Sequence, residues 1–203
     1  MRQLKNDLPA WYDQLREKYP VVTLDEWQLL HSMASVKHIK KGEPLLRYGY
    51  IARHAAFIIS GTFKFSILDE EGEEKIVKFG FQNDFLANCE SYNKKAASAI
   101  SIVAIEDAVV LRINIKRIQP LYSLHINLFR VNIQLIEELM AQQSEHQQIL
   151  SLRSPLQRYK FLMENRPLII QKISLTNIAR YLYTSREALS RAKLFLHKRP
   201  QSL

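Results

Sequence analysis

The residues best suited to chemistry lie close together near the end of the chain, in the run Thr184–Arg191. One face of a helix starting in this run would present four polar side chains: Arg186, Glu187, Ser190 and Arg191. Arginine donates two parallel hydrogen bonds to guanine, and glutamate accepts one from cytosine, each pairing discriminating by about 1–3 kcal/mol. The first turn of such a helix is the part that enters a major groove. The set therefore favours a helix that reads base edges in DNA.

Some of these residues also have a simpler interpretation. Thr184 and Glu187 have the spacing of a capping box, in which Glu187 only satisfies the start of the helix. Glu187 and Arg191 are four residues apart, so the two side chains could pair on a solvent-exposed face. For Glu187 both roles, helix cap and base contact, remain open and are compatible with each other. For the two arginines we favour contact with DNA.

The net charge of the chain is concentrated in the same region. The 203 residues include 29 Lys and Arg and 20 Asp and Glu. Residues 150–203 carry eleven Lys or Arg against two Glu, and residues 1–149 carry eighteen of each sign. Because DNA is a dense line of phosphates, a basic module beside a neutral one is typical of a DNA-binding protein with a separate control domain.

Three helices are predicted for the basic module, over residues 155–164, 174–182 and 185–196. Ser154 and Pro155 form a start signal for the first helix. Pro167 and an N-cap at Ser174 should separate the first two helices, and a corner at Tyr183 the last two. One face of the last helix should pack on Ile178, Ala179 and Leu182 of its predecessor through Leu189, Ala192, Phe195 and Leu196.

The glycines mark a different kind of segment. All five lie between residues 42 and 80, in a region rich in Phe, Ile and Val. Short β-prone runs between glycine turns indicate an all-β barrel or sandwich, here over residues 36–113. The predicted strands cover residues 56–59, 62–67, 75–79, 99–104 and 108–113, with an acidic hairpin tip at residues 69–74.

A long helix should connect these two parts, because residues 121–150 contain neither glycine nor proline. Apolar residues recur there at steps of three and four: Leu121, Leu124, Leu128, Val131 and Leu135. This spacing favours a coiled-coil seam between two chains, with a helix packed on its own barrel as the alternative. The predicted domains are therefore residues 1–115, 116–152 and 153–203.

Several classes of protein are disfavoured. The chain lacks 18 consecutive apolar residues and the apolar core of a signal peptide, which favours a cytoplasmic protein. The lone Cys89 rules out an internal disulfide and cannot by itself hold an iron–sulfur cluster or a structural zinc. The six histidines lack the paired spacing of a cupin-type metal site, and no catalytic triad or phosphate loop stands out. We expect neither catalysis nor a bound metal or cofactor.

Four stretches, two in each half of the chain, resemble the CRP/FNR family of bacterial transcription regulators. Residues 185–191 resemble the reading-helix signature of that family, and residues 173–182 resemble its first motif helix. Residues 41–49 and 57–65 resemble the opening strands of a cyclic-nucleotide-binding β-roll. The resemblance runs over residues 22–196 and implies an α+β protein with a jelly-roll domain, a long dimerisation helix and a C-terminal helix-turn-helix domain.

The resemblance also implies a function and partners. A family member would be a homodimer that binds a palindromic DNA operator, with RNA polymerase as a further partner and a small-molecule effector. By position it assigns base contacts to Arg186, Glu187 and Arg191. It makes contacts with phosphate plausible at the helix starts, at Ser174, Thr176, Thr184 and Ser185. An alternative is a ligand-sensing module that acts on a protein partner without specific DNA binding.

The sequence departs from the family in the effector pocket. Members that bind cyclic nucleotides carry a glycine and a glutamate where this chain has Ala87 and Asn88, and an arginine that is missing near residues 97–99. The nearby Lys94 and Lys95 lack the bidentate fork of arginine. We therefore predict that cyclic AMP is not bound in the usual way. The candidate pocket comprises Phe85, Ala87, Asn88, Ser98 and Ala99.

The C-terminal end departs from the family as well. Tyr183 stands where a glycine commonly makes the turn of the motif, and a bulky residue should avoid a left-handed backbone. We therefore expect an altered turn. Only residues 197–203 follow the reading helix, so the usual β-hairpin wing should be absent or reduced to a basic tail.

Overall fold

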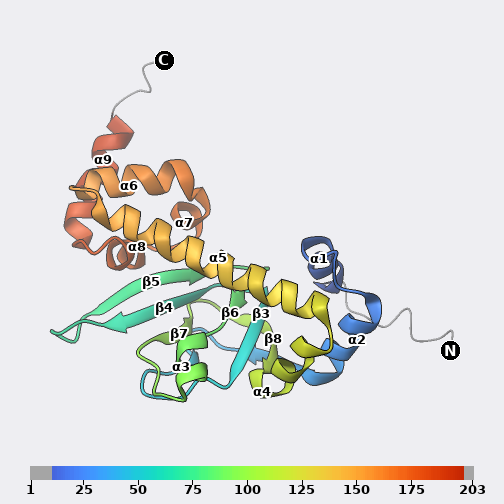
Figure 1. Cartoon of the computed structure of the whole chain (residues 1–203). Coiled ribbons are helices and arrows are strands. Elements are labelled where there is room, and N and C mark those ends of the chain that lie inside the picture. Colours follow the sequence, from blue (N-terminus) through green and yellow to red (C-terminus); the bar gives the residue numbers. More distant parts are fainter. Residues whose placement is uncertain (1–10, 199–203) are drawn as a thin grey trace. The chain divides into compact units, whose positions relative to one another are not determined.

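The structure is a computed structural model that describes residues 11–198 (Figure 1). These residues form two compact units. The first contains residues up to 63 together with residues 80–138, and the second contains residues 64–79 together with residues from 139 onward. None of the described helices is both long and apolar enough to cross a membrane.

The first unit holds short helices around most of the strands. Its helices are α1 (Trp11–Lys18), α2 (Leu24–Met33), α3 (Cys89–Lys94) and α4 (Ile115–Ile118), followed by a 3-10 turn, η1 (Gln119–Ser123). Its strands are β1 (Ala34–Ile39), β2 (Pro44–Leu46), β3 (His54–Ser60), β6 (Phe85–Leu86), β7 (Ser101–Ala104) and β8 (Ala108–Asn114). Helix α5 (Ile126–Ser151) begins in this unit and ends in the second.

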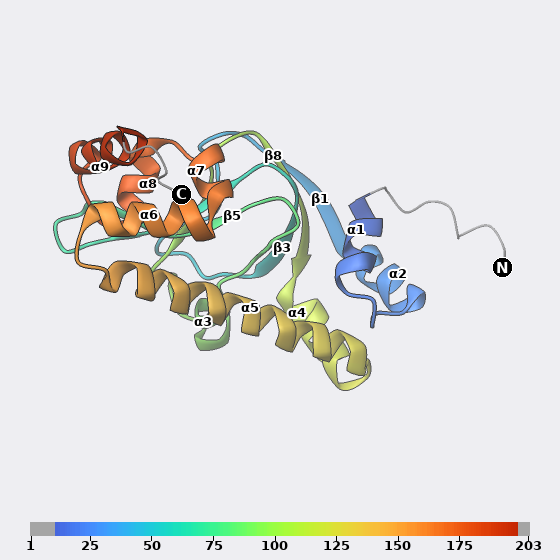
Figure 2. The same ribbon diagram turned by 90° about the horizontal axis from the view of Figure 1, so that it is seen from above.

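The second unit consists of a β-hairpin and the C-terminal helices. The hairpin is β4 (Phe63–Leu68) and β5 (Glu74–Gly80), and the helices are α6 (Pro155–Asn165), α7 (Pro167–Lys172), α8 (Leu175–Tyr181) and α9 (Arg186–Lys198). Figure 2 shows α6 to α9 gathered into one bundle. Residues 199–203, on which the expectation of a missing wing depends, lie outside the described residues.

The strands form two four-stranded sheets, in the orders β1-β8-β3-β6 and β2-β7-β4-β5. Strand β8 pairs antiparallel with β1, from Ala34 opposite Ile113 to Ile39 opposite Ala108, and with β3 on its other edge. This antiparallel sandwich followed by helices confirms the predicted α+β fold class. Each predicted strand overlaps an observed one, and the strand expected to begin at residue 99 begins at Ser101.

Gly61 is the glycine that the sandwich most clearly requires. Its φ is +95°, and a Cβ built there would lie 2.5 Å from Cβ of Ala108. Any side chain would therefore collide with β8 as well as strain the backbone. The predicted acidic hairpin tip is a turn that caps itself, because the Asp69 carboxylate accepts the Glu73 N–H at 2.8 Å and pairs with Lys75 at 3.1 Å.

Helix α5 differs from the predicted seam. Leu121 lies in η1 and Leu124 lies between η1 and α5, where it is exposed, so neither residue is on α5. Leu128 is 3% exposed in a core cluster with residues of α1, α2 and β3, and Leu121, Val131 and Leu135 pack against the same cluster. These four side chains therefore cover the core of their own chain, which was the alternative that the sequence left open.

A second apolar stripe runs along α5. Its members are exposed and again recur at steps of three and four: Ile126, Phe129, Ile133, Ile136 and Met140. At about 100° per residue these side chains face roughly opposite to Leu128 and Leu135. The residues predicted for a seam between chains are thus on the stripe that faces inward, and α5 carries a second apolar stripe that is exposed.

The helices of the second unit differ from prediction in two respects. Pro167 starts a helix of its own, α7, instead of only separating its neighbours, as proline is well tolerated at a first helical position. Leu189 and Ala192 of α9 are buried as predicted, whereas Phe195 is 45% exposed. Figure 1 shows that the C-terminal end of α9 projects beyond the other helices of the second unit.

Candidate functional site

The predicted reading element is the pair of helices α8 and α9. Ser174 caps α8, accepting the Asn177 N–H at 3.3 Å, and Ser185 caps α9, accepting the Ala188 N–H at 3.1 Å. The capping box that the spacing of Thr184 and Glu187 allowed is not formed, because α9 starts at Arg186, one residue later than that box requires. Glu187 is not needed to close the start of the helix.

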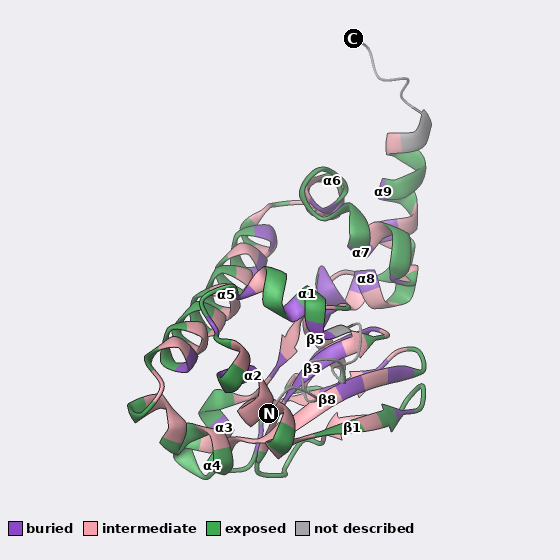
Figure 3. Cartoon of the chain, turned by 90° about the vertical axis from the view of Figure 1, so that its right-hand side faces the viewer, coloured by how far each residue is buried: buried purple, intermediate pink, exposed green. Residues whose placement is uncertain are grey.

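The predicted base-contacting side chains lie on the outer surface of this element. Arg186, Glu187 and Arg191 are exposed, and Ser190 is half-buried beside them. Figure 3 shows that exposed residues predominate along α9. Within the described part of the chain, none of the three charged side chains forms an ion pair, including the Glu187–Arg191 pair that the spacing allowed. Two guanidinium groups and one carboxylate are thus left to water.

The residues suggested for phosphate contact also surround this element. Ser174, Thr176 and Ser185 are exposed, and Thr184 is half-buried. Ser174 and Ser185 use their hydroxyl oxygens as helix caps, but each hydroxyl can still donate its proton to an external acceptor. All four residues lie at or near the starts of α8 and α9, where backbone N–H groups favour an anion.

The turn between α8 and α9 contradicts the expectation for Tyr183. This residue has a φ of +50°, in the left-handed region that a bulky residue was expected to avoid. The neighbouring contacts explain how the turn is held: the Thr184 N–H donates to the Ala179 carbonyl at 3.0 Å, and Arg158 donates to the Leu182 carbonyl at 2.8 Å. Arg158 also donates to the carbonyls of Leu150 and Leu152, which joins the end of α5 to this turn.

A buried histidine packs against Tyr181, at the end of α8 just before this turn. His146 of α5 is 6% exposed, and its ring stacks on Tyr181 with 4.2 Å between ring centroids. Its Nε2 lies 2.8 Å from the Tyr181 carbonyl oxygen, which can only accept, so Nε2 carries the proton. Burial lowers the pKa of His146, so the neutral ring is the form that fits this position.

Sequence reasoning missed one ionic contact of α8. Arg180 donates to Glu74 of the hairpin at 2.6 Å, and Lys64 pairs with the same carboxylate at 2.6 Å. Burial alone would raise the pKa of Glu74, but the hydrogen bond and charge of Lys64, followed by the charge of Arg180, lower it. The two partners are 106 residues apart in sequence, so no local pattern could have indicated the contact.

The candidate effector residues of the first unit fall into separate places. Asn88 and Ser98 are brought together, with the Asn88 amide donating to the Ser98 hydroxyl at 2.8 Å. The Asn88 carbonyl oxygen caps α3 by accepting the Ser91 N–H, and the buried Ser98 hydroxyl donates to the Ile100 carbonyl at 2.7 Å. These polar groups of the segment from residue 85 to residue 100 therefore satisfy one another, and Asn88 also lines a cavity of about 280 Å³ with Arg47 and Arg53. We refer to this segment as the cassette.

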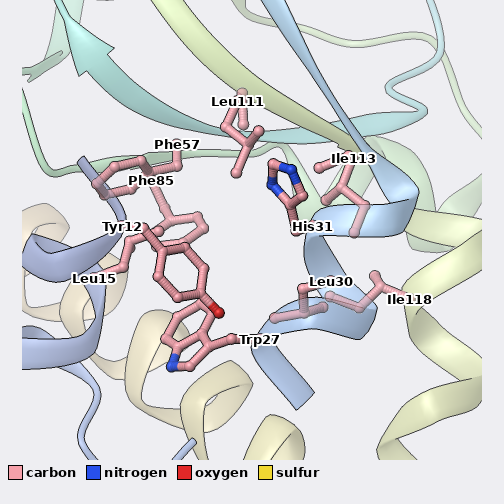
Figure 4. A pocket seen from close by; sticks show the side chains of 12 residues that line it. Tyr12, Leu15, Trp27, Leu30, His31, Phe57, Phe85, Leu111, Ile113 and Ile118 are labelled. Atoms are coloured by element: carbon pink, nitrogen blue, oxygen red, sulfur yellow. The ribbon is translucent and has the colours of Figure 1, made fainter. Parts of the chain in front are cut away.

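Phe85 points away from that polar group. Its ring lies 5.3 Å from Phe57 and 6.1 Å from Tyr19, on the side of the sheet covered by α1 and α2. There it lines an almost wholly apolar cavity of about 70 Å³ together with Tyr12 and Trp27 (Figure 4). Ala87 is half-buried and Ala99 is exposed. The five predicted residues therefore do not form one pocket.

Metal binding finds no support in the described residues. Nowhere between residues 11 and 198 do three His, Cys, Asp or Glu side chains gather in a way that could hold a metal ion. Cys89 is exposed and forms no disulfide.

Comparison with known proteins gives a sequence match for one domain and structural matches over most of the chain. Residues 36–125 match the cyclic nucleotide-binding domain family. FixK2 from Bradyrhizobium japonicum has a similar structure, with a TM-score of 0.69 and 18% identity over 81% of this chain and 84% of that chain. No curated protein sequence matches the chain significantly.

Two further solved structures give the same result. The regulator CLP from Xanthomonas campestris, described as responsive to c-di-GMP, has a TM-score of 0.68 and 14% identity over 84% of this chain and 90% of that chain. A transcriptional regulator assigned to the crp/fnr family, from Eubacterium rectale, has a TM-score of 0.68 and 18% identity over 94% of this chain and 87% of that chain. The chain therefore has the fold of the CRP/FNR transcription regulators, with a cyclic nucleotide-binding-type domain at residues 36–125.

Proposed function

We propose that this chain is a sequence-specific DNA-binding transcription regulator. The observation that carries the proposal is the exposed face of α9, where Arg186, Glu187 and Arg191 have no ion-pair partner among the described residues. These side chains lie in the first two turns of the helix, the part that reaches base edges in a groove. The segment around them holds the net positive charge that a phosphate backbone attracts.

The regulator would act as a homodimer joined through the exposed stripe of α5. Five apolar side chains that a monomer leaves in water, from Ile126 to Met140, would form the seam. A two-fold axis along this seam would present two copies of α9 to half-sites about one DNA turn apart, roughly 34 Å. A palindromic operator follows from that symmetry.

The first unit would act as the control domain, without cyclic AMP bound in the usual way. The cassette has no arginine for the cyclic phosphate, only Lys94 and Lys95, and its Asn88 and Ser98 groups already bond to each other. Burying a phosphate there would cost several kcal/mol without a paired charge. As a regulator of transcription the protein would work in the cytoplasm with RNA polymerase, and it would not be an enzyme.

The test is selection of binding sites from a pool of random double-stranded DNA, followed by binding measurements at increasing salt. We expect an enriched palindrome and an affinity that falls steeply with salt, because each neutralised phosphate releases counterions. A pool without enrichment, together with binding that does not depend on sequence, would contradict the proposal. A protein that binds no DNA at any salt would instead favour a sensing module that acts on a protein partner.

The seam is tested by placing a carboxylate on the exposed stripe of α5 in one variant and on its buried side in another. Ile133→Asp should give folded monomers in analytical ultracentrifugation and weaken binding to a full palindrome. Leu128→Asp should instead unfold the first unit, because it puts a carboxylate into the core cluster. Gln134→Asp changes an exposed side chain off the stripe and serves as the control. Dimers of unchanged stability with Ile133→Asp would rule out this stripe as the seam.

A further inference from the structure

The first unit contains an open cleft at the C-terminal end of α3, the end opposite the Asn88 cap. Its volume is about 640 Å³, within the range of small-molecule sites. Three stretches of chain form it: the loop before β3, the end of α3, and the junction of β8 with α4 and η1. Its lining residues are Ile51, Ala52, Arg53, Tyr92, Asn93, Lys95, Asn114, Lys116 and Gln119.

The charges of the cleft are all of one sign. Arg53, Lys95 and Lys116 line it, and no aspartate or glutamate does. Among the described residues none of these three cations forms an ion pair. The one carboxylate of α3, on Glu90, is already paired with Lys94 at 2.8 Å.

The adjacent histidine is consistent with a positive potential at this place. His54 follows Arg53 in the chain. Burial lowers the pKa of His54, and the positive charges of Arg112, Arg53 and Lys37 lower it further. The pKa of His54 is thus lowered mainly by burial, and Arg53 is the one of these three cations that also lines the cleft.

Two amide side chains of the cleft have their oxygens engaged in hydrogen bonds within the fold. The Asn114 side-chain oxygen accepts the Lys116 N–H at 2.9 Å, and the Gln119 side-chain oxygen accepts the Tyr92 hydroxyl at 3.0 Å. Each amide therefore has its oxygen in use and its NH₂ group available. Two amide donors thus accompany three cations.

We propose that this cleft binds a small anion that carries two or more phosphate groups. Arginine and lysine together suit phosphate, the guanidinium as a bidentate fork and the ammonium as a point charge. Three separated cations in 640 Å³ leave more room and charge than a single phosphate uses. Tyr92 and Ile51 at its wall offer apolar surface to an organic part of the ligand. The cleft shares Tyr92, Asn93 and Lys95 with the cassette but is not lined by Asn88 or Ser98, and its occupancy does not depend on DNA binding.

The experiment is calorimetric titration of the full chain with inorganic pyrophosphate at low salt, and with citrate as a carboxylate of similar charge. We expect one pyrophosphate per chain, bound more tightly than citrate. The double variant Arg53→Gln with Lys116→Gln should weaken pyrophosphate binding at least about tenfold, because it removes two charge-assisted contacts. The double variant Arg16→Gln with Lys41→Gln removes the same charge from exposed positions outside the cleft and should leave binding unchanged.

A second pair of variants separates this site from the basic face of α9. Arg186→Gln with Arg191→Gln should leave pyrophosphate binding intact while reducing DNA binding. Loss of pyrophosphate binding in that variant, with retention in Arg53→Gln/Lys116→Gln, would place the anion on α9 and overturn the proposal. Equal affinity for citrate, or no binding of pyrophosphate by the parent chain, would overturn it as well. Circular dichroism of each variant confirms that the folds compared are the same.

Discussion

The cassette and the exposed face of α9 use polar residues in opposite ways. In the cassette, Asn88 and Ser98 bond to each other, and Ser98 is 2% exposed. On α9, Arg186 and Arg191 face water and have no ion-pair partner among the described residues. One set of groups is satisfied within the fold, and the other is available to an external partner.

This difference shows where a ligand can bind at low cost. A ligand in the cassette would have to break buried hydrogen bonds, and each group left unsatisfied costs about 1–3 kcal/mol. A ligand on α9 displaces only water and counterions. The departure from the family pattern in the cassette and the retained pattern on α9 therefore differ in a physical way: Asn88 and Ser98 bond to each other, whereas the α9 arginines have no ion-pair partner among the described residues.

The largest expected effect separates the two regions by their role in DNA binding. Arg186→Ala and Arg191→Ala should each cost about 1–3 kcal/mol of specific binding, or roughly 5-fold to 150-fold in affinity, and relax preference at one base position. Fluorescence polarisation with the selected operator and with single-base variants measures both effects. Ser98→Ala should leave DNA affinity unchanged. An equal loss on all DNA sequences would identify the arginines as phosphate contacts and not as base readers.

The next effect concerns the stability of the cassette. Ser98→Ala should lower the free energy of unfolding by about 1–3 kcal/mol, because it leaves the buried partners of the Ser98 hydroxyl without a hydrogen bond. Urea denaturation followed by circular dichroism measures the change. Ser35→Ala is the control, since its hydroxyl is exposed and its bond to Arg112 is long, at 3.5 Å. If both variants were equally stable, the cassette would not be held by this bond.

Features determined by local sequence were predicted well. Capping at Ser154 and Ser174, the strands between the glycines and the amphipathic pattern of α9 all depend on residues within a few positions of one another. The exposed reading set followed from the same helical periodicity. The fold as a whole was anticipated by its resemblance to a known family more than by these local rules.

Features determined by distant contacts were predicted poorly. Helix α5 has two apolar stripes with the same spacing, and only the packing of α1 and α2 shows that Leu128 and Leu135 face inward. The left-handed Tyr183 depends on hydrogen bonds from Arg158 and Thr184 that no local rule includes. Phe85 was assigned to a pocket by its neighbours in sequence, but successive residues of a strand face opposite sides.

A smaller effect tests the contact of His146 with Tyr181 at the α8–α9 turn. Burial lowers the pKa of His146 below that of the unfolded chain, so the unfolded state takes up more protons below about pH 6.5. The stabilisation from neutral His146 is complete above that pH and is lost as the pH falls, by at most about 1.4 kcal/mol per pH unit. His146→Gln retains a donor for the Tyr181 carbonyl but does not titrate. Denaturation of both proteins between pH 7 and pH 5 should show a steeper loss in the parent, and parallel curves would contradict this.

The smallest effect tests the backbone of the same turn. A left-handed φ costs a residue with a side chain about 1–2 kcal/mol, and glycine is spared that cost. Tyr183→Gly and Tyr183→Ala both remove the ring that contacts His146, so the difference between them isolates the backbone. We expect the glycine variant to be more stable than the alanine variant by about 1 kcal/mol in urea denaturation, the reverse of their order at an ordinary position. The opposite order would mean that residue 183 leaves the left-handed region once its ring is removed, and that the ring contact with His146 holds the turn.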